Sequence, residues 1–195
     1  MFPEYVEIKG KKYKINTDFR IAIECNRVAE DDTIGDLERG LAVIYLLFGD
    51  EGLDTPEHYE DLLKLAKRYL SCDEELNTKR NEKPDMDFIE DYGYIWASMF
   101  ADYHGLDIDK ENIHWWKFID LLNGLSNSEL GNTCILNRIR NIRTANPKDI
   151  KDVKERQKLI DLQKQFSLKK NKKSKEKLNE KEKDSAKEFL KHFIK

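Results

Sequence analysis

Residues Asp87–Leu125 read DFIEDYGYIWASMFADYHGLDIDKENIHWWKFIDLLNGL and contain all three tryptophans of the chain. We call them the Trp-rich segment. Apolar side chains recur in it at three- and four-residue steps, which is the spacing of one face of an α-helix. The first run is Phe88, Tyr92, Ile95, Trp96, Met99, Phe100 and Tyr103, and the second is Ile113, Trp115, Trp116, Phe118, Ile119, Leu122 and Leu125. Gly105 lies between the runs and can end a helix with a positive φ. The segment predicts two helices around a tight turn, and its aromatic area makes them the expected centre of the core.

The composition favours a helical protein with a strongly charged surface. The chain has 195 residues, of which 39% are hydrophobic and 37% are charged. Nine glycines and four prolines are too few for a turn-rich β fold, and the length allows one domain with a core plus an extension. We therefore expect a mainly α fold, a helical bundle with a small N-terminal β-hairpin over residues 4–15 and an extended, charged C-terminal helix or tail.

Local signals predict further helices on both sides of the Trp-rich segment. Capping residues precede each of them, at Thr17 or Asp18, Thr33, Thr55–Pro56 and the capping box Ser126–Glu129. The helix after Thr33 is expected to place on one side Leu37, Leu41, Ile44, Leu47 and Phe48. We expect the acidic run Gly49–Asp54 to be a loop and the charged run Asp73–Pro84 to be a linker that faces water.

Charge divides the chain near residue 150. Residues 151–195 contain sixteen Lys and Arg against eight Asp and Glu, so they carry a net charge of +8, whereas the remainder carries −11. We expect a helical domain with the β-hairpin over residues 1–147 and a basic extension over residues 148–195 that ends in an amphipathic helix. The apolar face of that helix consists of Phe189, Leu190, Phe193 and Ile194. Such a helix can lie in a groove of a partner or fold back on its own domain, and both alternatives stay open.

Signatures of enzymes and cofactor sites are absent from the sequence. There is no GxxxxGK[ST] or GxGxxG motif, and the four histidines lack metal-binding HExxH or HxxxH spacing. The run Gly49–Asp54 lacks the alternating carboxylates of a calcium loop. The three cysteines, Cys25, Cys72 and Cys134, are widely spaced, which indicates buried or inert thiols in a reducing compartment. We expect no enzymatic activity, no cofactor and no metal.

The sequence also bears on the kind of partner. Without an apolar run near about 18 residues or a signal peptide, we expect a soluble intracellular protein without a membrane partner. The lysines of the extension alternate with glutamates and lack the aromatic residues that stack on bases, so we expect no nucleic-acid partner. Adjacent helical residues point about 100° apart, so at least one of Trp115 and Trp116 belongs to the core while the other can mark a partner surface. The candidate partner-binding residues are Trp115, Trp116, Phe118, Phe189, Leu190, Phe193 and Ile194.

Several stretches share a pattern with a known family. They are Asp87-Phe88, YIWASMF at Tyr94–Phe100, YHGLDI at Tyr103–Ile108, IHWWKF at Ile113–Phe118, LLNGL at Leu121–Leu125 and the N-terminal INTDFRIAI at Ile15–Ile23. Together they resemble a family of small proteins from long-tailed bacteriophages and prophages of Gram-positive bacteria. The resemblance covers about residues 4–145, and its most specific part is the HWWKF stretch.

The resemblance implies a role in tail morphogenesis, because members of this family are similar to tail assembly chaperones. Those proteins bind the tape-measure protein and keep it soluble until tail tube protein replaces them. The implied partners are thus the tape-measure protein and the tail tube protein, with self-association as a further expectation, and the implied location is the host cytoplasm. The alternatives are a structural tail or head–tail connector component of the virion, or a nucleic-acid-binding regulator. The resemblance implies no catalytic residues.

Overall fold

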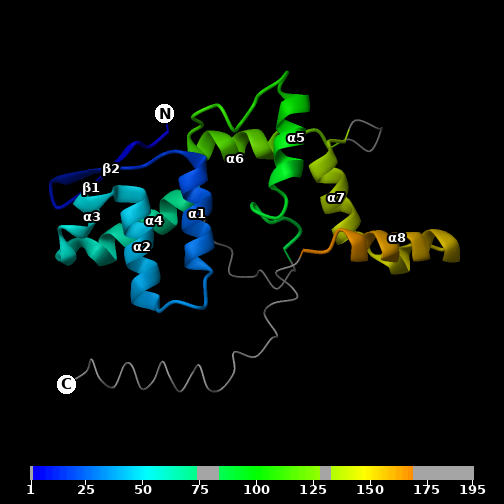
Figure 1. The fold of residues 1–195 in the computed structure, drawn as a ribbon, viewed down its shortest axis with the longest axis horizontal. Helices are drawn as coiled ribbons and strands as arrows, with labels where there is room; N and C mark the ends of the chain where they lie inside the picture. Colours follow the sequence, from blue (N-terminus) through cyan, green and yellow to red (C-terminus); the bar gives the residue numbers. More distant parts are fainter. Residues whose placement is uncertain (1, 74–83, 128–132, 169–195) are drawn as a thin grey trace, which may run out of the picture.

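The computed structural model describes residues 2–73, 84–127 and 133–168 of the chain. Within them it is mainly helical and begins with a two-stranded antiparallel β-hairpin, as the sequence predicts (Figure 1). The N-terminal half contains β1 (Tyr5–Ile8), β2 (Lys11–Lys14), α1 (Phe19–Ala29), α2 (Asp36–Phe48), α3 (Asp50–Leu53), the 3-10 helix η1 (Pro56–His58) and α4 (Tyr59–Leu70). The remainder contains α5 (Tyr92–Asp102), α6 (Trp115–Asn123), α7 (Ile135–Thr144), the 3-10 helix η2 (Pro147–Asp149) and α8 (Val153–Gln165).

The β-hairpin is attached to the helices by its inward side chains. β1 and β2 pair from Tyr5↔Lys14 to Ile8↔Lys11 around a turn in which Gly10 has a φ of 84°. Tyr13 is fully buried, and its hydroxyl lies 2.6 Å from Nδ1 of the buried His58 in η1. Because two strands alone are marginally stable, this buried contact with the helices is what keeps the hairpin folded.

The start of α2 differs from the prediction. Thr33 was expected to be its N-cap, but the backbone N–H and the hydroxyl of Thr33 both donate to the Asp31 carboxylate. This local turn moves the N-cap to Gly35, whose N–H donates to the Glu38 carboxylate at 2.9 Å. The helix before it agrees with the prediction, because the side chain of Asp18 caps α1. An aspartate two residues before a threonine thus decides where α2 begins.

The acidic run Gly49–Asp54 was expected to be a loop, but Asp50–Leu53 form the short helix α3. Its Gly52 is buried against α2. A Cβ atom on Gly52 would lie 2.8 Å from Cγ2 of Ile44 and 2.9 Å from Cβ of Phe48. The absence of a side chain at this position is therefore what lets α3 pack against α2.

We expect Gly52→Ala to lower the free energy of unfolding by about 1–3 kcal/mol, because the added methyl group overpacks the contact between α3 and α2. Urea denaturation measures the change. Gly93→Ala in α5 is the matched control, since its Cβ would meet no atom within 4 Å. This control is expected to leave stability unchanged or to raise it by up to about 1 kcal/mol, because alanine is the better helix former. Equal losses in the two variants would contradict the packing role of Gly52.

The Trp-rich segment forms two helices, α5 and α6, but they are not joined by a tight turn. Gly105 ends the first helix region with a φ of 91°, and the chain then runs through the buried Ile108 and Ile113 before α6 begins. The two helices cross instead of lying side by side (Figure 1). Apolar residues in the connection hold it against the core, and this length of chain is what allows the crossing.

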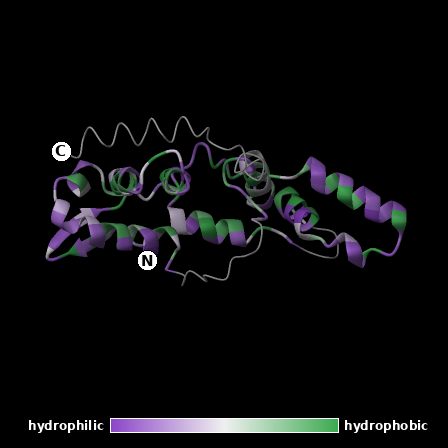
Figure 2. Cartoon of the chain, turned by 90° about the horizontal axis from the view of Figure 1, so that it is seen from below, coloured by the Kyte–Doolittle hydropathy of each residue, from purple (hydrophilic) through white to green (hydrophobic). Residues whose placement is uncertain are grey.

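The core forms around the Trp-rich segment, as predicted. Phe19 of α1 stacks on Phe118 of α6 with ring centroids 4.3 Å apart, and Trp115 also stacks on Phe118, at 5.9 Å. Hydrophobic residues form bands along the helices in Figure 2, with hydrophilic bands between them. Stacked rings of this kind contribute about 0.5–1.5 kcal/mol beyond the area that they bury.

The last described elements pack on α7. Cys134 is the N-cap of α7, so the described helix begins after the predicted Ser126–Glu129 box, part of which lies outside the described residues. The side-chain amide of Gln163 in α8 donates to the carbonyls of Ile142 and Ala145, at 2.9 and 2.7 Å. The domain boundary at residue 147 stays a prediction. Most of the predicted linker Asp73–Pro84 and the predicted amphipathic helix with Phe189, Leu190, Phe193 and Ile194 lie outside the described residues.

Candidate partner-binding site

The two adjacent tryptophans and Phe118 hold the core together. Trp115 and Phe118 are 2% and 0% exposed, and Trp116 is half-buried. Both indole N–H groups donate to the end of α4: that of Trp115 to the Leu70 carbonyl at 3.1 Å, and that of Trp116 to the Tyr69 carbonyl at 2.8 Å. The last carbonyls of a helix lack partners inside the helix, and the Trp115 indole supplies one for Leu70. The Trp116 indole adds a second donor to the Tyr69 carbonyl, which also accepts from the Cys72 N–H at 3.1 Å. A partner-binding role for these three residues stays a prediction.

Replacing Trp116 by phenylalanine is expected to cost about 1 kcal/mol of stability, because the Tyr69 carbonyl keeps only the Cys72 N–H as a donor while most of the ring packing remains. Chemical denaturation followed by circular dichroism gives the difference. Tyr45→Phe serves as the control, since Tyr45 is 52% exposed and water can replace its hydroxyl contacts. A Trp116→Phe variant as stable as the original chain would show that the indole N–H contributes nothing.

His114 fixes the start of α6, a role that the sequence did not reveal. Its Nδ1 accepts a hydrogen bond from the Trp116 N–H at 3.1 Å, as an N-cap side chain does. Because Nδ1 accepts, the proton lies on Nε2, which donates to the Pro3 carbonyl at 3.0 Å. Phe2 stacks on the imidazole at 4.9 Å. The His-Trp-Trp motif therefore joins the N-terminus, α6 and α4 into one unit.

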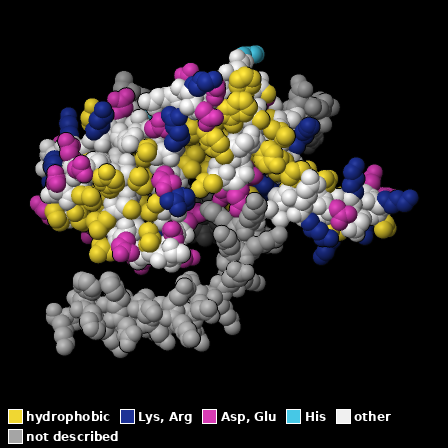
Figure 3. Space-filling model, in the orientation of Figure 1, with side chains coloured by type: hydrophobic (Ala, Val, Ile, Leu, Met, Phe, Trp, Pro, Cys, Tyr) yellow, Lys and Arg dark blue, Asp and Glu magenta, His cyan; other side chains and the backbone are white. Residues whose placement is uncertain are grey.

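Helix α5 is apolar on two opposite sides. Ile95, Ser98 and Met99 face the core and are buried. The opposite side, which we call the α5 face, consists of Ile89, Gly93, Trp96, Ala97 and Phe100. The sequence predicted that Phe100 lies with Ile95 and Met99, but Phe100 is 43% exposed and Ile89 is 49% exposed. Figure 3 shows apolar side chains gathered over α5.

The aromatic residues of the α5 face are held in place. Trp96 and Phe100 stack with ring centroids 5.1 Å apart, and the Trp96 indole donates to the Asp107 carboxylate at 3.0 Å. Gly93 leaves open space beside them, because no atom lies within 4 Å of where its Cβ would be. Aromatic side chains that are held in place before binding lower the entropic cost of binding, which is a property of interface hot spots.

The α5 face itself contains no charged residue, and the Asp107 carboxylate beside it is engaged by the Trp96 indole and by Lys110. No residue from Tyr92 to Ala101 is charged, although charged residues make up 37% of the chain. Next to α5, the N–H of Leu136 donates to the Ser98 hydroxyl at 3.1 Å, which places the start of α7 beside the middle of α5. The neighbouring Ile135 is 43% exposed. Few charges together with Tyr, Trp, Phe and Met are the composition of an interface core.

A buried ion pair fixes the base of α5. The Arg143 guanidinium of α7 donates to both carboxylate oxygens of Asp91, at 2.6 and 2.8 Å, and Asp91 is 1% exposed. Arg143 also donates to the carbonyls of Asp85 and Phe166. The hydrogen bonds with Asp91 hold the pKa of Arg143 above its ordinary value. This network joins the start of α5, α7 and the end of α8, so the α5 face rests on a rigid base.

A second exposed apolar surface lies on α2 and α4. We call it the α2 face, and it consists of Leu37, Leu41, Tyr45 and Leu63. Leu37 is 73% exposed, Tyr45 is 52% exposed and Leu63 is 37% exposed. Ile44 and Leu47, which were expected on the same side of the helix as Leu37, are fully buried, so the core covers only part of that side.

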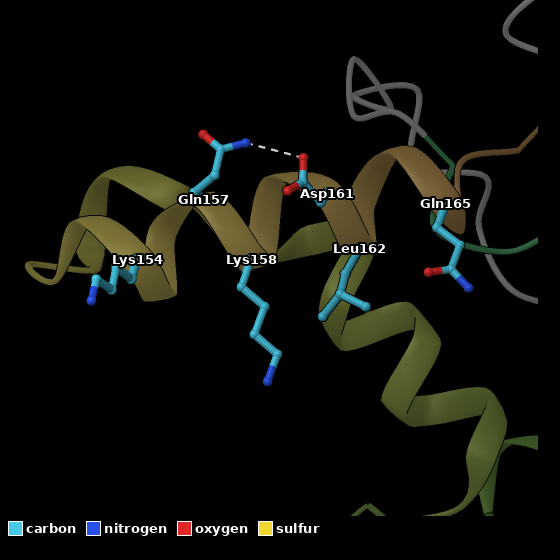
Figure 4. Close-up of a pocket in the computed structure, with 6 residues that line it drawn as sticks. All are labelled: Lys154, Gln157, Lys158, Asp161, Leu162 and Gln165. Carbon is cyan, nitrogen blue, oxygen red and sulfur yellow. Dashed lines mark hydrogen bonds between the residues drawn. The ribbon is translucent and has the colours of Figure 1, made fainter.

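We searched the described residues for metal ligands and for a reactive thiol. No three His, Cys, Asp or Glu side chains among them converge as metal ligands would. Burial raises the pKa of the Cys25 thiol to about 12, so it is a poor nucleophile. The hollow along α8 in Figure 4 is lined by side chains that point apart, and Gln157 and Asp161 are joined by one hydrogen bond of 3.0 Å. No helix in the described ranges is long and apolar enough to cross a bilayer.

Comparison with known proteins gives one match. The model of a family described as Bacteriophage Gp15 protein matches residues 1–168, which include the whole described part of the chain. No curated protein and no solved structure matches the chain.

Proposed function

Because the chain belongs to the Bacteriophage Gp15 protein family, we propose that it is a tail assembly chaperone that binds the tape-measure protein and keeps it soluble during tail morphogenesis. The match to this family supports the conclusion that the chain is a bacteriophage protein. The resemblance in the Trp-rich segment supports the role in tail morphogenesis. The observation that carries the proposal is the α5 face, an exposed apolar surface without charge on a protein that is otherwise heavily charged.

The α5 face suits an amphipathic helix of the client. A helix that is apolar all round is normally buried, so the exposed side of α5 calls for a partner that covers it. Trp96 and Phe100 provide the aromatic anchors, and the space at Gly93 can take an apolar side chain of the client. Recognition by apolar contacts at helical spacing accepts many sequences, which a chaperone of a long helical client requires.

The charge of the body supports fast capture of a client. The residues before 151 carry a net charge of −11, so basic stretches of a helical client are attracted to them. Such attraction raises the association rate more than the final affinity. Moderate affinity is what this role needs, because tail tube protein must later displace the chaperone. In this proposal the chain acts in the host cytoplasm, without catalysis, and leaves the tape-measure protein as the tube forms.

Co-expression tests the proposal. The tape-measure protein encoded in the same gene cluster is produced alone and together with this chain, and its soluble fraction is measured. We expect it to be soluble only in the presence of the chain and to co-purify with it. An insoluble tape-measure protein in both cases, beside a soluble and folded partner chain, would contradict the proposal.

A further inference from the structure

The α2 face lies in the most acidic part of the protein. Residues 31–61 contain ten Asp and Glu and one Arg, which gives them a net charge of −9. That arginine, Arg39, is already engaged by the carboxylates of Asp32 and Asp36. Figure 3 shows apolar side chains over α2 with Asp and Glu side chains around them. An apolar surface with an acidic rim suits a ligand that combines apolar and basic side chains.

Several carboxylates of the rim have no cation within the described part of the chain. Asp50, Glu51, Asp54 and Glu57 are exposed and form no ion pair with described residues. They follow α2 directly, in α3 and η1, and α3 packs against α2. Their repulsion is relieved when basic groups bind, so these carboxylates favour a basic ligand on the α2 face.

The C-terminal residues of the same chain have this chemistry. Residues 169–195 contain eleven Lys against five Asp and Glu, a net charge of +6. At helical spacing, the segment Ser185–Lys195 places Phe189, Leu190, Phe193 and Ile194 on one side. At about 100° per residue, Lys187 falls at the edge of that side, and Lys191 and Lys195 fall progressively further round, toward the opposite side. The sequence pattern is that of a short amphipathic segment whose polar side is basic.

The connection is long enough for this segment to reach α2. About 20 residues lie between Leu168, which is buried at the end of the described chain, and Phe189. Fully extended they span up to about 70 Å, whereas a domain of this size has a radius of gyration of about 15 Å. Tethering through about 20 residues gives an effective concentration of about 1 mM, so a Kd of about 0.1 mM would keep the segment bound roughly nine-tenths of the time.

We propose that Ser185–Lys195 of the same chain binds the α2 face as an amphipathic helix. Phe189, Leu190, Phe193 and Ile194 contact Leu37, Leu41, Tyr45 and Leu63. Lys187, Lys191 and Lys195 pair with the carboxylates of residues 31–61. The contact covers the second exposed apolar surface of the protein and neutralises its most acidic part. It is independent of the client-binding role of the α5 face.

Photo-cross-linking in the full-length chain tests the contact. Phe193→p-benzoylphenylalanine is introduced, the protein is irradiated, and the adducts are mapped by mass spectrometry. A mixture of isotopically light and heavy chains separates contacts within one chain from contacts between two. We expect adducts within single chains on peptides that contain Asp36–Phe48 or Leu63. Adducts that join light to heavy chains, lie on α5 or spread evenly over the surface would overturn the proposal.

Charge reversal in the tail provides the second test. Lys187→Glu, Lys191→Glu and Lys195→Glu together are expected to reduce the yield of adducts on α2 by about tenfold. The attraction between these positions and the acidic residues around the α2 face is lost, so the tethered segment is mostly detached. The matched control is Lys169→Glu, Lys170→Glu and Lys172→Glu, which makes the same change of charge outside the amphipathic segment. We expect a smaller loss in this control. Equal losses in both variants would overturn the specific pairing.

Discussion

Replacing Arg143 by alanine is expected to lower the free energy of unfolding by about 3–5 kcal/mol, because it leaves the buried Asp91 carboxylate without its partner. Asp91 is 1% exposed and accepts two hydrogen bonds from Arg143, beside one from the Asp87 N–H at 3.0 Å. The variant also loses the donors to the carbonyls of Asp85 and Phe166. Since small proteins have a total stability of about 5–15 kcal/mol, this single change removes a large part of it. Urea denaturation at neutral pH measures the loss.

The same helix offers a matched control. Arg140 pairs with Asp85 at 2.9 Å, but both side chains are about one-third exposed, at 34% and 36%. Ion pairs with this exposure contribute about 0–1 kcal/mol, so Arg140→Ala is expected to be nearly as stable as the original chain. If Arg143→Ala and Arg140→Ala lost the same small amount, the buried network would not be what fixes α5.

Phe100→Asp is expected to weaken binding of the tape-measure protein by roughly 30- to 150-fold, which corresponds to the loss of about 2–3 kcal/mol at an interface hot spot. The change removes half of the Trp96–Phe100 stack and places a carboxylate in the middle of the α5 face. Because Phe100 is 43% exposed, the fold should tolerate the substitution. Titration of the purified chain against a soluble helical fragment of the tape-measure protein gives the Kd, and thermal unfolding shows whether the fold is intact.

Val153→Asp is the control for this experiment. Val153 is also apolar and is 72% exposed, but it lies in α8, outside the α5 face. The added charge is the same, so a non-specific effect of negative charge on the client would appear in both variants. We expect Val153→Asp to bind as the original chain does. A folded Phe100→Asp variant with unchanged affinity would exclude the α5 face as the client site.

Local patterns in the sequence predicted those elements whose signals lie within a few residues. The β-hairpin, the helix after Asp18 and the core around Phe118 follow from alternation, capping and helical spacing. A helix after Thr55–Pro56 was also predicted, but Thr55 makes no capping hydrogen bond, Pro56 begins the 3-10 helix η1, and α4 starts only at Tyr59. The start of α2 was missed because the Asp31 side chain binds Thr33 before Thr33 can cap a helix. Helix α3 was missed because its residues are mostly acidic and the residue that packs against α2 is a glycine, Gly52, which gives no apolar signal.

The candidate site depended on neighbours that lie far away in the sequence. Helical spacing groups Phe100 with Ile95, but α5 is apolar on both sides, and periodicity alone cannot tell which side the core covers. The ion pair between Arg143 and Asp91 helps to fix which side of α5 faces the core, and its two residues lie 52 positions apart in the sequence. In the same way, the sequence does not show that the indoles of the two adjacent tryptophans bind the end of α4. Long-range contacts of this kind leave no local pattern in a single sequence.

We propose that the chain acts on the tape-measure protein before the tail is complete and then departs. Mass spectrometry of tape-measure-containing assemblies, isolated before and after tail completion, tests this departure. We predict that the chain is abundant in the early assemblies and absent from finished particles, which keep the tape-measure and tail tube proteins. A stoichiometric amount of the chain in finished particles would contradict the account and would identify it as a structural component of the virion.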